Sequence, residues 1–333
     1  MALAHFSHLL TKFLFKGLKS RIILYNGEEA ITNQPFRLLY VGSNTDLCII
    51  TYRFYGSHPF EEKDLGECWF FQVKQRLAGL AQQADLVLVS RNCFSKWAPR
   101  KGRWMVVPSQ LRMVMDFTPG QEWSSIEKVM KKRQSYNIHK MRNNGYHLET
   151  STDPKDLDFF ISQMYLPYIG HRYKDQGQVA SRWYLKELFP HAELKFAVCP
   201  DGKRVAGLYC YRQGRVAHWM YLAALNGNEY WTQQGALAAV YYLGIQEAFE
   251  NGLRRVDVGE VRPFQDEKLY THKKHWGFKP VLHPWNYCDW LFWAPDESSF
   301  AAEWLDVHPP ISGFAHHSKT SSEISAVLSL KRG

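Results

Sequence analysis

Side chains that can move protons gather between residues 257 and 272. Val256-Asp257-Val258-Gly259-Glu260 ends an apolar stretch expected to be a strand, and α/β sheets usually place ligands at the carboxyl edge of such strands. Tyr270 and His272 follow soon afterwards. Transfer of a chemical group needs a base for the incoming nucleophile and an acid for the leaving group. Glu260 or Asp257 can supply the base, and Tyr270 or His272 the acid.

His218 is a further candidate base, because it lies on the expected strand Arg215–Leu225. This strand is apolar almost throughout, which indicates a central position covered on both faces. A single histidine in such a strand is also commonly a hydrogen-bonded core residue. Both interpretations of His218 remain open.

The loop that follows this strand can hold an anionic group. It covers Gly227–Ala236 and leads into a helix expected over Gly235–Glu250. Backbone N–H groups and the positive end of the dipole favour a phosphate at a helix N-terminus. Gly235 would let a ligand approach the backbone closely. An ordinary capped helix would have the same pattern.

Two motifs make Arg215–Phe278 resemble the acyl-CoA-binding half of the GNAT acyltransferases, in the double-domain branch of the FemAB-like and BioF2-like proteins. One motif is the glycine loop, in which Gly235 fits the first glycine of Q/R-x-x-G-x-G/A while Thr232 and Leu237 depart from it. The other is a strand ending in Asp-x-Gly, followed by a lysine–aromatic–glycine element. Its residues are Asp257, Gly259, Lys273, Trp276, Gly277 and Phe278.

The resemblance implies an α/β (α+β) fold of tandem GNAT-like modules, with mixed central sheets flanked by helices. It also implies acyl-CoA, such as acetyl-CoA, as co-substrate, and no metal. In GNAT folds the strand corresponding to residues 216–225 splays from its neighbour and pairs with the pantetheine arm. The cofactor-binding residues by resemblance are Tyr221, Leu222, Ala223, Gln233, Gln234, Gly235, Ala236 and Lys273. The helix that lines the acceptor pocket in these proteins corresponds to Met164–Tyr173, which makes Tyr165, Tyr168, Arg172 and, from the later motif, His272 candidate substrate contacts.

The length of 333 residues indicates about two domains. Strand, helix and strand are expected near residues 47, 65 and 85, and again near 215, 235 and 254, an offset of about 168 residues. We interpret this order as a diverged duplication. The predicted domains are a degenerate GNAT-like module (1–120), an acyltransferase module (121–310) and a flexible tail (311–333).

The hydrophobic pattern and turn residues predict the remaining elements. In the first half, strands are expected over Phe36–Val41, Leu47–Phe54, Asp85–Val89, Trp104–Val107 and Leu111–Phe117, with a helix over Leu65–Gln83. In the second half, helices are expected over Ser124–Asn143 and Pro154–Tyr173, the latter with Asp153 as its N-cap. Strands are expected over Tyr146–Thr150, Glu193–Cys199, Arg204–Tyr211, Arg254–Val258 and Tyr287–Trp293, the last closing the second sheet.

The net charge of +9 and the pI of about 9.1 favour an anionic partner, such as CoA, tRNA, a glycan or an acidic membrane. The helix Ser124–Asn143 is strongly basic, although such a face is commonly only solvated. Residues 1–20 form an amphipathic pattern that can lie on an anionic membrane or pack on its own domain. The six cysteines include no Cys-x-x-Cys pair, which favours free thiols in a reducing compartment. We therefore expect a cytoplasmic protein, with peripheral contact to the inner membrane surface as an option.

The sequence supports three functions. The favoured one is an N-acyltransferase that moves an acyl group from acyl-CoA to an amine acceptor, for which a cell-envelope or polysaccharide precursor is a candidate. The second is a FemAB-like transferase that takes an amino acid from aminoacyl-tRNA. The third is a non-catalytic GNAT-like protein of the envelope or membrane surface.

Overall fold

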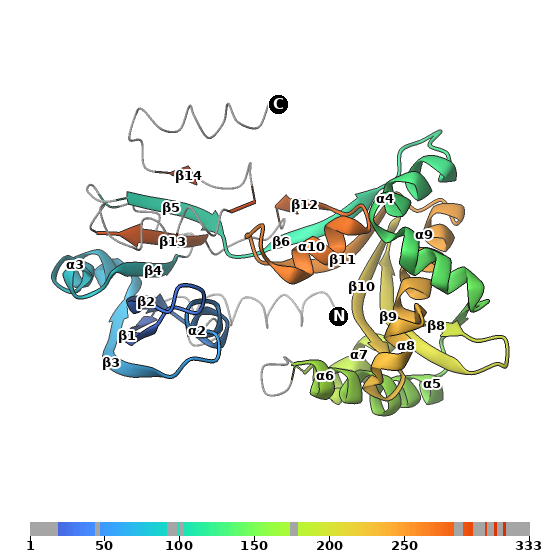
Figure 1. Cartoon of the computed structure of the whole chain (residues 1–333), viewed down its shortest axis with the longest axis horizontal. Coiled ribbons are helices and arrows are strands. Elements are labelled where there is room, and N and C mark those ends of the chain that lie inside the picture. Colours follow the sequence, from blue (N-terminus) through green and yellow to red (C-terminus); the bar gives the residue numbers. More distant parts are fainter. Residues whose placement is uncertain are drawn as a thin grey trace. The chain divides into compact units, whose positions relative to one another are not determined.

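The computed structural model describes residues 19–43, 47–91, 99, 103–173, 179–282, 289–295, 304, 310–311 and 316–317. The chain divides into two compact units (Figure 1). The first unit comprises Met1–Gln110, Arg262–Asp266 and Leu282–Gly333, and the second comprises Leu111–Val261 and Glu267–Val281. Residues 1–18 and almost all of the predicted tail 311–333 lie outside the described residues.

The first unit is built on a seven-stranded mixed sheet in the order β14-β5-β13-β4-β2-β1-β3. Its strands are β1 (Lys19–Glu28), β2 (Pro35–Gly42), β3 (Phe60–Trp69), β4 (Leu86–Arg91), β5 (Arg103–Pro108), β13 (Asp289–Ala294) and β14 (His316–His317). Its helices are α2 (Leu47–Tyr55) and α3 (Val73–Leu80), with single 3-10 turns at Phe70–Gln72 and Ala81–Gln83. Leu38 and Tyr40 of β2 share a core with α2, whereas Leu39 and Val41 share one with α3. Successive strand residues thus bury opposite faces of this sheet.

The second unit contains another seven-stranded mixed sheet, in the order β12-β6-β11-β10-β9-β8-β7. Its strands are β6 (Leu111–Asp116), β7 (His147–Ser151), β8 (Ala192–Val198), β9 (Arg204–Gln213), β10 (Val216–Ala224), β11 (Arg255–Val261) and β12 (Lys279–Leu282). Its α-helices are α4 (Trp123–Asn143), α5 (Pro154–Phe159), α6 (Leu166–Tyr173), α7 (Arg182–Leu188), α8 (Glu229–Gln233), α9 (Ala236–Glu250) and α10 (Lys268–His275). A π-helical turn (Phe160–Tyr165) joins α5 to α6, and 3-10 turns lie at Phe189–His191 and Leu225–Gly227.

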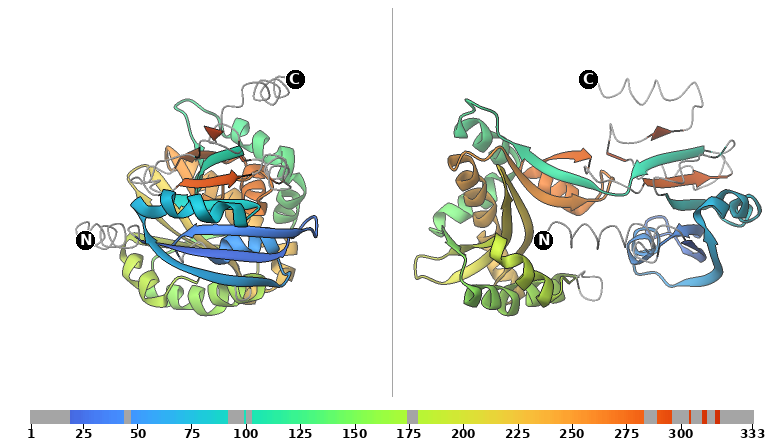
Figure 2. Two further views of the ribbon diagram at one scale, coloured as in Figure 1. Left: turned by 90° about the vertical axis from the view of Figure 1, so that its left-hand side faces the viewer. Right: turned by 180° about the vertical axis from the view of Figure 1, so that it is seen from behind.

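Helices cover this second sheet (Figures 1 and 2). Helix α9 packs closely on β10, where a Cβ on Gly244 would lie 3.0 Å from the Trp219 ring. The α5–α6 segment contributes Phe160, Met164 and Tyr165 to a core that also holds Tyr209 of β9 and Ala223 of β10. The predicted α/β class, with two mixed sheets flanked by helices, is therefore confirmed.

Two predicted elements of the first unit are wrong. Leu47–Phe54 was expected to be a strand and forms helix α2, in which Ile50 and Phe54, four residues apart, face one core. The helix expected over Leu65–Gln83 begins only at Val73, because Leu65–Trp69 continues β3, which pairs with β1. The proposed offset therefore does not superpose equivalent elements.

The two sheets nevertheless share a plan. In the first, β1 and β2 are antiparallel and β2 runs parallel to β4. In the second, β9 and β10 are antiparallel and β10 runs parallel to β11. The next strand in each sheet is antiparallel and comes from a distant part of the chain: β13 beside β4, and β6 beside β11.

This exchange of strands changes two expectations about the chain's organisation. The strand predicted over Tyr287–Trp293 corresponds to β13, which pairs with β4 and β5 of the first unit and so does not close the second sheet. The division between units also falls at residues 110 and 111, with returns to the first unit at 262 and 282, and differs from the expected boundaries at 120 and 310.

No helix in the described ranges has both the length and the apolar character needed to cross a membrane.

Candidate functional site

Strands β10 and β11 are paired only over their first residues and then separate. Their parallel pairing joins Val216 to Arg255, Ala217 to Val256 and His218 to Asp257. Both strands are fully described and continue, β10 to Ala224 and β11 to Val261. In the first unit, by contrast, the pairing of β2 with β4 runs on to Val41 and Val89, near the ends of both strands. An opening between the two parallel strands therefore distinguishes the second sheet.

Bulges accompany the divergence of the two strands. The register of β10 against β9 shifts between Trp219 and Tyr221, and that of β11 against β6 shifts between Asp257 and Glu260. Gly259 has φ +77°, in the left-handed region that favours glycine. Its N–H donates to Oδ1 of Asp257 at 2.9 Å. Bulges bend strands and increase their twist, so the Asp-x-Gly motif has a direct structural role in shaping the opening.

Asp257 lies at the last paired position and is the centre of a polar cluster. Its side chain is only 6% exposed, and Oδ2 lies 2.7 Å from Nε of Arg112. Nδ1 of His218 is 3.6 Å from the same oxygen, just beyond hydrogen-bond distance. Burial disfavours the carboxylate, but the neighbouring His218 and Arg112 outweigh it and lower the pKa of Asp257. The aspartate is therefore ionised and suited to orienting the imidazole.

The His218 ring lies at the edge of this cluster. It is half-buried, with 15% of its side chain exposed. One face of the imidazole ring stacks on Tyr211 of β9, with ring centroids 4.7 Å apart and an interplanar angle of 14°. The stacking on Tyr211 holds the imidazole beside Asp257, where β10 and β11 separate.

Lys273 of α10 is buried, with 5% of its surface exposed, and holds the backbone of β11. Its Nζ donates to the carbonyl of Glu260 at 3.0 Å. Burial lowers the pKa of Lys273 to about 8, while the charges of Asp257 and Glu260 oppose this change. The lysine of the lysine–aromatic–glycine element thus ties α10 to the bulge.

The other predicted acid–base residues lie on β11 and α10. Glu260 is exposed and pairs in register with Arg112 of β6. Tyr270 is buried at 6% exposure, whereas His272 is exposed and packs edge-to-face on Tyr241 at 5.4 Å. Residues two apart on a helix point about 200° from each other, so Tyr270 and His272 do not face the same site.

Residues Tyr221, Leu222 and Ala223 lie on the open stretch of β10, beyond its last pair with β11. Tyr221 is half-buried, and its ring centroid lies 5.0 Å from that of Tyr165. Ala223 is fully buried in the α5–α6 core. The predicted pantetheine contacts are thus brought together at the opening.

The glycine loop is braced against helix α4. Gly235 has φ +85°, and a Cβ there would lie 3.1 Å from the backbone nitrogen of Met141. The carbonyl of Gln233 accepts from Nζ of Lys140 at 2.9 Å, and that of Gln234 accepts from Nδ2 of Asn144 at 2.8 Å. Ala236 is fully buried. The contact with α4 explains the glycine without a ligand.

The predicted acceptor residues occupy the π turn and α6. The hydroxyl of Tyr165 accepts the backbone N–H of Ala180 at 2.8 Å. The hydroxyl of Tyr168 accepts from Nη1 of Arg172 at 2.7 Å. The charge of Arg172 also acts on the His272 ring. Tyr168 and Arg172 are thus in contact, whereas Tyr165 instead packs against Tyr221.

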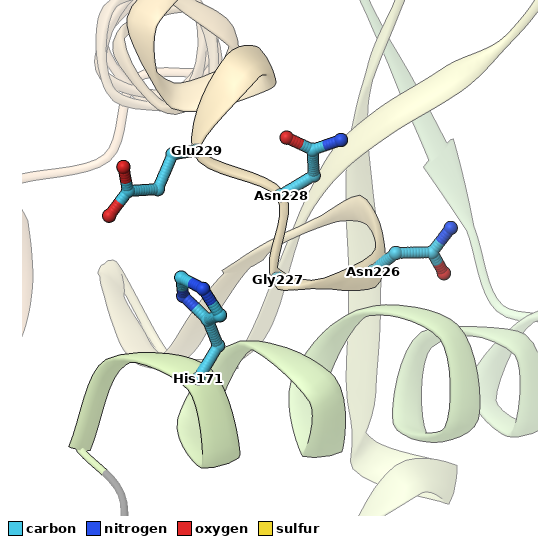
Figure 3. A pocket seen from close by; sticks show the side chains of 5 residues that line it. All are labelled: His171, Asn226, Gly227, Asn228 and Glu229. Atoms are coloured by element: carbon cyan, nitrogen blue, oxygen red, sulfur yellow. The ribbon is translucent and has the colours of Figure 1, made fainter.

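A cavity of about 480 Å³ lies at the end of β10, where the loop Gly227–Ala236 that was expected to hold an anionic group begins (Figure 3). Its lining residues are His171, Asn226, Gly227, Asn228 and Glu229. The ring of His171 points from α6 towards the start of α8, where Glu229 lies (Figure 3). Asn226 and Gly227 have positive φ angles, which an Asn-Gly pair commonly allows. The Asn226-Gly227 pair was the feature of the sequence that could have indicated this tight turn.

Sequence reasoning missed Arg112, because its place beside Asp257 depends on the pairing of β6 with β11. Within the described residues, no group of three or more His, Cys, Asp or Glu side chains could hold a metal ion.

Comparison with known proteins points to one family. Residues 129–272 match the family model described as an acetyltransferase (GNAT) domain. Among solved structures, FemX is 12% identical, with 83% of this chain and 84% of that chain covered and a TM-score of 0.44. L-PGS from Bacillus licheniformis is 12% identical, with 85% and 87% covered and a TM-score of 0.37. No curated protein sequence matches the chain.

The matched segment begins within α4, ends within α10 and contains β10, β11 and the cluster around Asp257 except for Arg112 and Lys273. The resemblance expected from the Asp-x-Gly and glycine-loop motifs is thereby confirmed. Residues 129–272 are therefore similar to the acetyltransferase (GNAT) domain family.

Proposed function

We propose that the second unit transfers an acyl group from acyl-CoA to an amine acceptor. The observation that supports this best is the opening between β10 and β11 after His218 and Asp257. A strand whose edge is no longer paired can bind an extended ligand by strand addition. The pantetheine arm is such a ligand, and it would contact the backbone of Tyr221, Leu222 and Ala223.

The donor's phosphates require a different site from the one expected at Gly235. Because the glycine faces α4, its lack of a side chain does not bring a ligand close to the backbone. Lys140 lies beside this loop through its hydrogen bond to Gln233. We propose that Lys140, at the edge of this loop, contacts the donor's phosphates, while Lys273 acts indirectly by fixing β11.

We propose His218 as the general base and Asp257 as the residue that orients it. The carboxylate favours a proton on Nδ1, which leaves Nε2 free to take a proton from the acceptor's ammonium. The neutral amine then attacks the thioester carbonyl carbon, the carbon–sulfur bond breaks, and the proton that the acylated nitrogen loses passes to the departing thiolate. Glu260, which is exposed beside the same bulge, is the second candidate for the base. The acid roles of Tyr270 and His272 stay predictions.

The acceptor is expected near Tyr168, Arg172 and His272. A guanidinium at this place suits an acceptor that carries a carboxylate or phosphate besides its amine. A cell-envelope or polysaccharide precursor has this chemistry, and we propose that the reaction takes place in the cytoplasm.

The test measures acetyl-CoA binding by calorimetry and thiol release in the presence of a panel of amines and amino sugars. His218→Asn should lower kcat/KM by about 10²–10⁴-fold and leave acetyl-CoA binding unchanged. His191→Asn, at an exposed histidine of the same unit, is the matched control. Failure of the wild-type chain to bind acetyl-CoA would contradict the donor, and equal activity of both variants would contradict the base.

Aminoacyl-tRNA is the second candidate donor, because part of the basic face of α4 is open to solvent. Lys131 and Arg142 of this helix are paired with Glu127. Three other basic residues are exposed: Lys128, Lys132 and Arg133. Binding of tRNA that weakens steeply with salt, together with no binding of acetyl-CoA, would favour this donor.

A further inference from the structure

Two large aromatic side chains are exposed side by side in the first unit, where β3 leads into α3. Trp69 is 42% exposed and Phe71 is 66% exposed. Their rings stack with centroids 6.3 Å apart and an interplanar angle of 11°. Phe70 packs edge-to-face on Phe71 at 5.5 Å. Contiguous aromatic surface of this kind on a folded protein usually marks an interaction site.

The surroundings of this aromatic tip, defined as Trp69–Phe71, are positively charged. The stretch from Cys68 to Ala84 contains no aspartate or glutamate and includes Lys74 and Arg76, both exposed. Lys19 adds a third positive charge, with Nζ 5.3 Å from the centre of the Trp69 ring.

The acidic residues that border this stretch are paired. Glu67 lies 3.9 Å from Nζ of Lys19, and Asp85 accepts from Arg37 at 2.7 Å. The tip therefore combines exposed aromatic rings with a local excess of positive charge.

The tip is anchored firmly to the fold. Cys68 before it, and Val73 and Leu77 after it, are buried in the core beneath α3. The backbone N–H of Trp69 donates to Oε1 of Gln72 at 3.1 Å, which closes the 3-10 turn. Because the turn is fixed while its rings are exposed, the aromatics are presented outward at little cost in conformational entropy.

We propose that the aromatic tip is a membrane-contact surface, which inserts Trp69 and Phe71 into the interface of an anionic bilayer. Tryptophan and phenylalanine partition into the interfacial layer, and nearby lysine and arginine are attracted to anionic headgroups. Strand pairing also places Lys19 directly opposite Trp69.

This inference is independent of the proposed acyl transfer, and its test needs no substrate. The full chain is sedimented with vesicles made of equal parts of phosphatidylcholine and phosphatidylglycerol, and with vesicles of phosphatidylcholine alone. We expect binding to the anionic vesicles to be stronger by about 30-fold, because Lys74 and Arg76 lie near the surface while the charge of Lys19 is balanced by Glu67. The double variant W69A/F71A should bind the anionic vesicles at least about tenfold more weakly.

Trp183→Ala is the matched control, since Trp183 is 70% exposed on α7 of the second unit. It should bind vesicles like the wild type. Far-ultraviolet circular dichroism and thermal unfolding verify that W69A/F71A is folded, as expected for exposed positions. The proposal would be overturned if the wild-type protein did not bind the anionic vesicles. It would also be overturned if W69A/F71A and Trp183→Ala bound these vesicles equally. The second result would assign any membrane contact to another part of the chain.

Discussion

The buried ammonium of Lys273 should make stability rise with pH in alkaline solution. Burial lowers its pKa from the ordinary value of 10.5 to about 8. A group with a lowered pKa in the folded state binds fewer protons there than in the unfolded chain. Between about pH 8 and about pH 10.5 the unfolded state therefore holds the extra proton, and the free energy of unfolding rises with pH.

The size of this effect follows from the same values. A fall from 10.5 to about 8 corresponds to about 3 kcal/mol, at about 1.4 kcal/mol for each tenfold change in the ionisation equilibrium. Replacing Lys273 by methionine removes the titrating group and keeps the aliphatic stem. It also removes the hydrogen bond to the Glu260 carbonyl, which contributes about 1.5–3 kcal/mol in the opposite direction. The wild type and Lys273→Met should thus have similar free energies of unfolding near neutral pH, and these energies should diverge as the pH rises.

The assay is urea unfolding of the wild type and Lys273→Met at several values between about pH 7 and about pH 10.5. The wild type should gain about 3 kcal/mol over the variant across this range. Lys274→Met, at the exposed neighbouring lysine, should show no such divergence. A difference between wild type and Lys273→Met that stays constant with pH would refute the argument, because it would mean that Lys273 has the same pKa in both states.

Three further predictions concern stability and can be measured by urea unfolding. Gly235→Ala should cost about 2 kcal/mol or more, because a left-handed residue gains a Cβ 3.1 Å from Met141; a loss under 0.5 kcal/mol, roughly the size of ordinary surface effects, would contradict the packing. Glu127→Gln should cost about 1–2 kcal/mol at neutral pH, and this cost should vanish as the pH falls through about 4 to 2, since hydrogen bonds lower the pKa of Glu127 to about 2. Tyr165→Phe should cost about 1 kcal/mol, because the N–H of Ala180 loses its acceptor; an unchanged midpoint would show that water replaces the hydroxyl.

Elements with strong local signals could be predicted from the sequence. Asp153 accepts the N–H of Lys155 and caps the helix that begins at Pro154, as expected. Helix α4 ends at Asn143, before the Asn144-Gly145 stop. The incorrect predictions occurred where contacts with distant segments determine the secondary structure. Leu47–Tyr55 is rich in residues that favour strands, yet its apolar side chains at helical spacing meet the first sheet's core.

The candidate site divides in the same way. The Asp-x-Gly motif correctly pointed to β11, because the aspartate and the left-handed glycine form a local turn. The role of Lys273 could not be inferred, since its partner is a backbone carbonyl on another element. Gly235 was expected to let a ligand approach the backbone closely, whereas the structure shows that helix α4 lies against it.

The sequence by itself determined the α/β class, most of the helices and strands of the second unit, and the motifs that indicate acyl transfer. The class and the elements depend on hydrophobic periodicity and turn residues, which act within a few positions along the chain, whereas the motifs indicate acyl transfer through their resemblance to a known family. Only the tertiary structure decided that β6 and β13 cross between the two halves, that Arg112 joins Asp257, and that the expected separation of β10 from β11 begins after His218. Each of these arises from pairing between distant segments, whose energy no local pattern records.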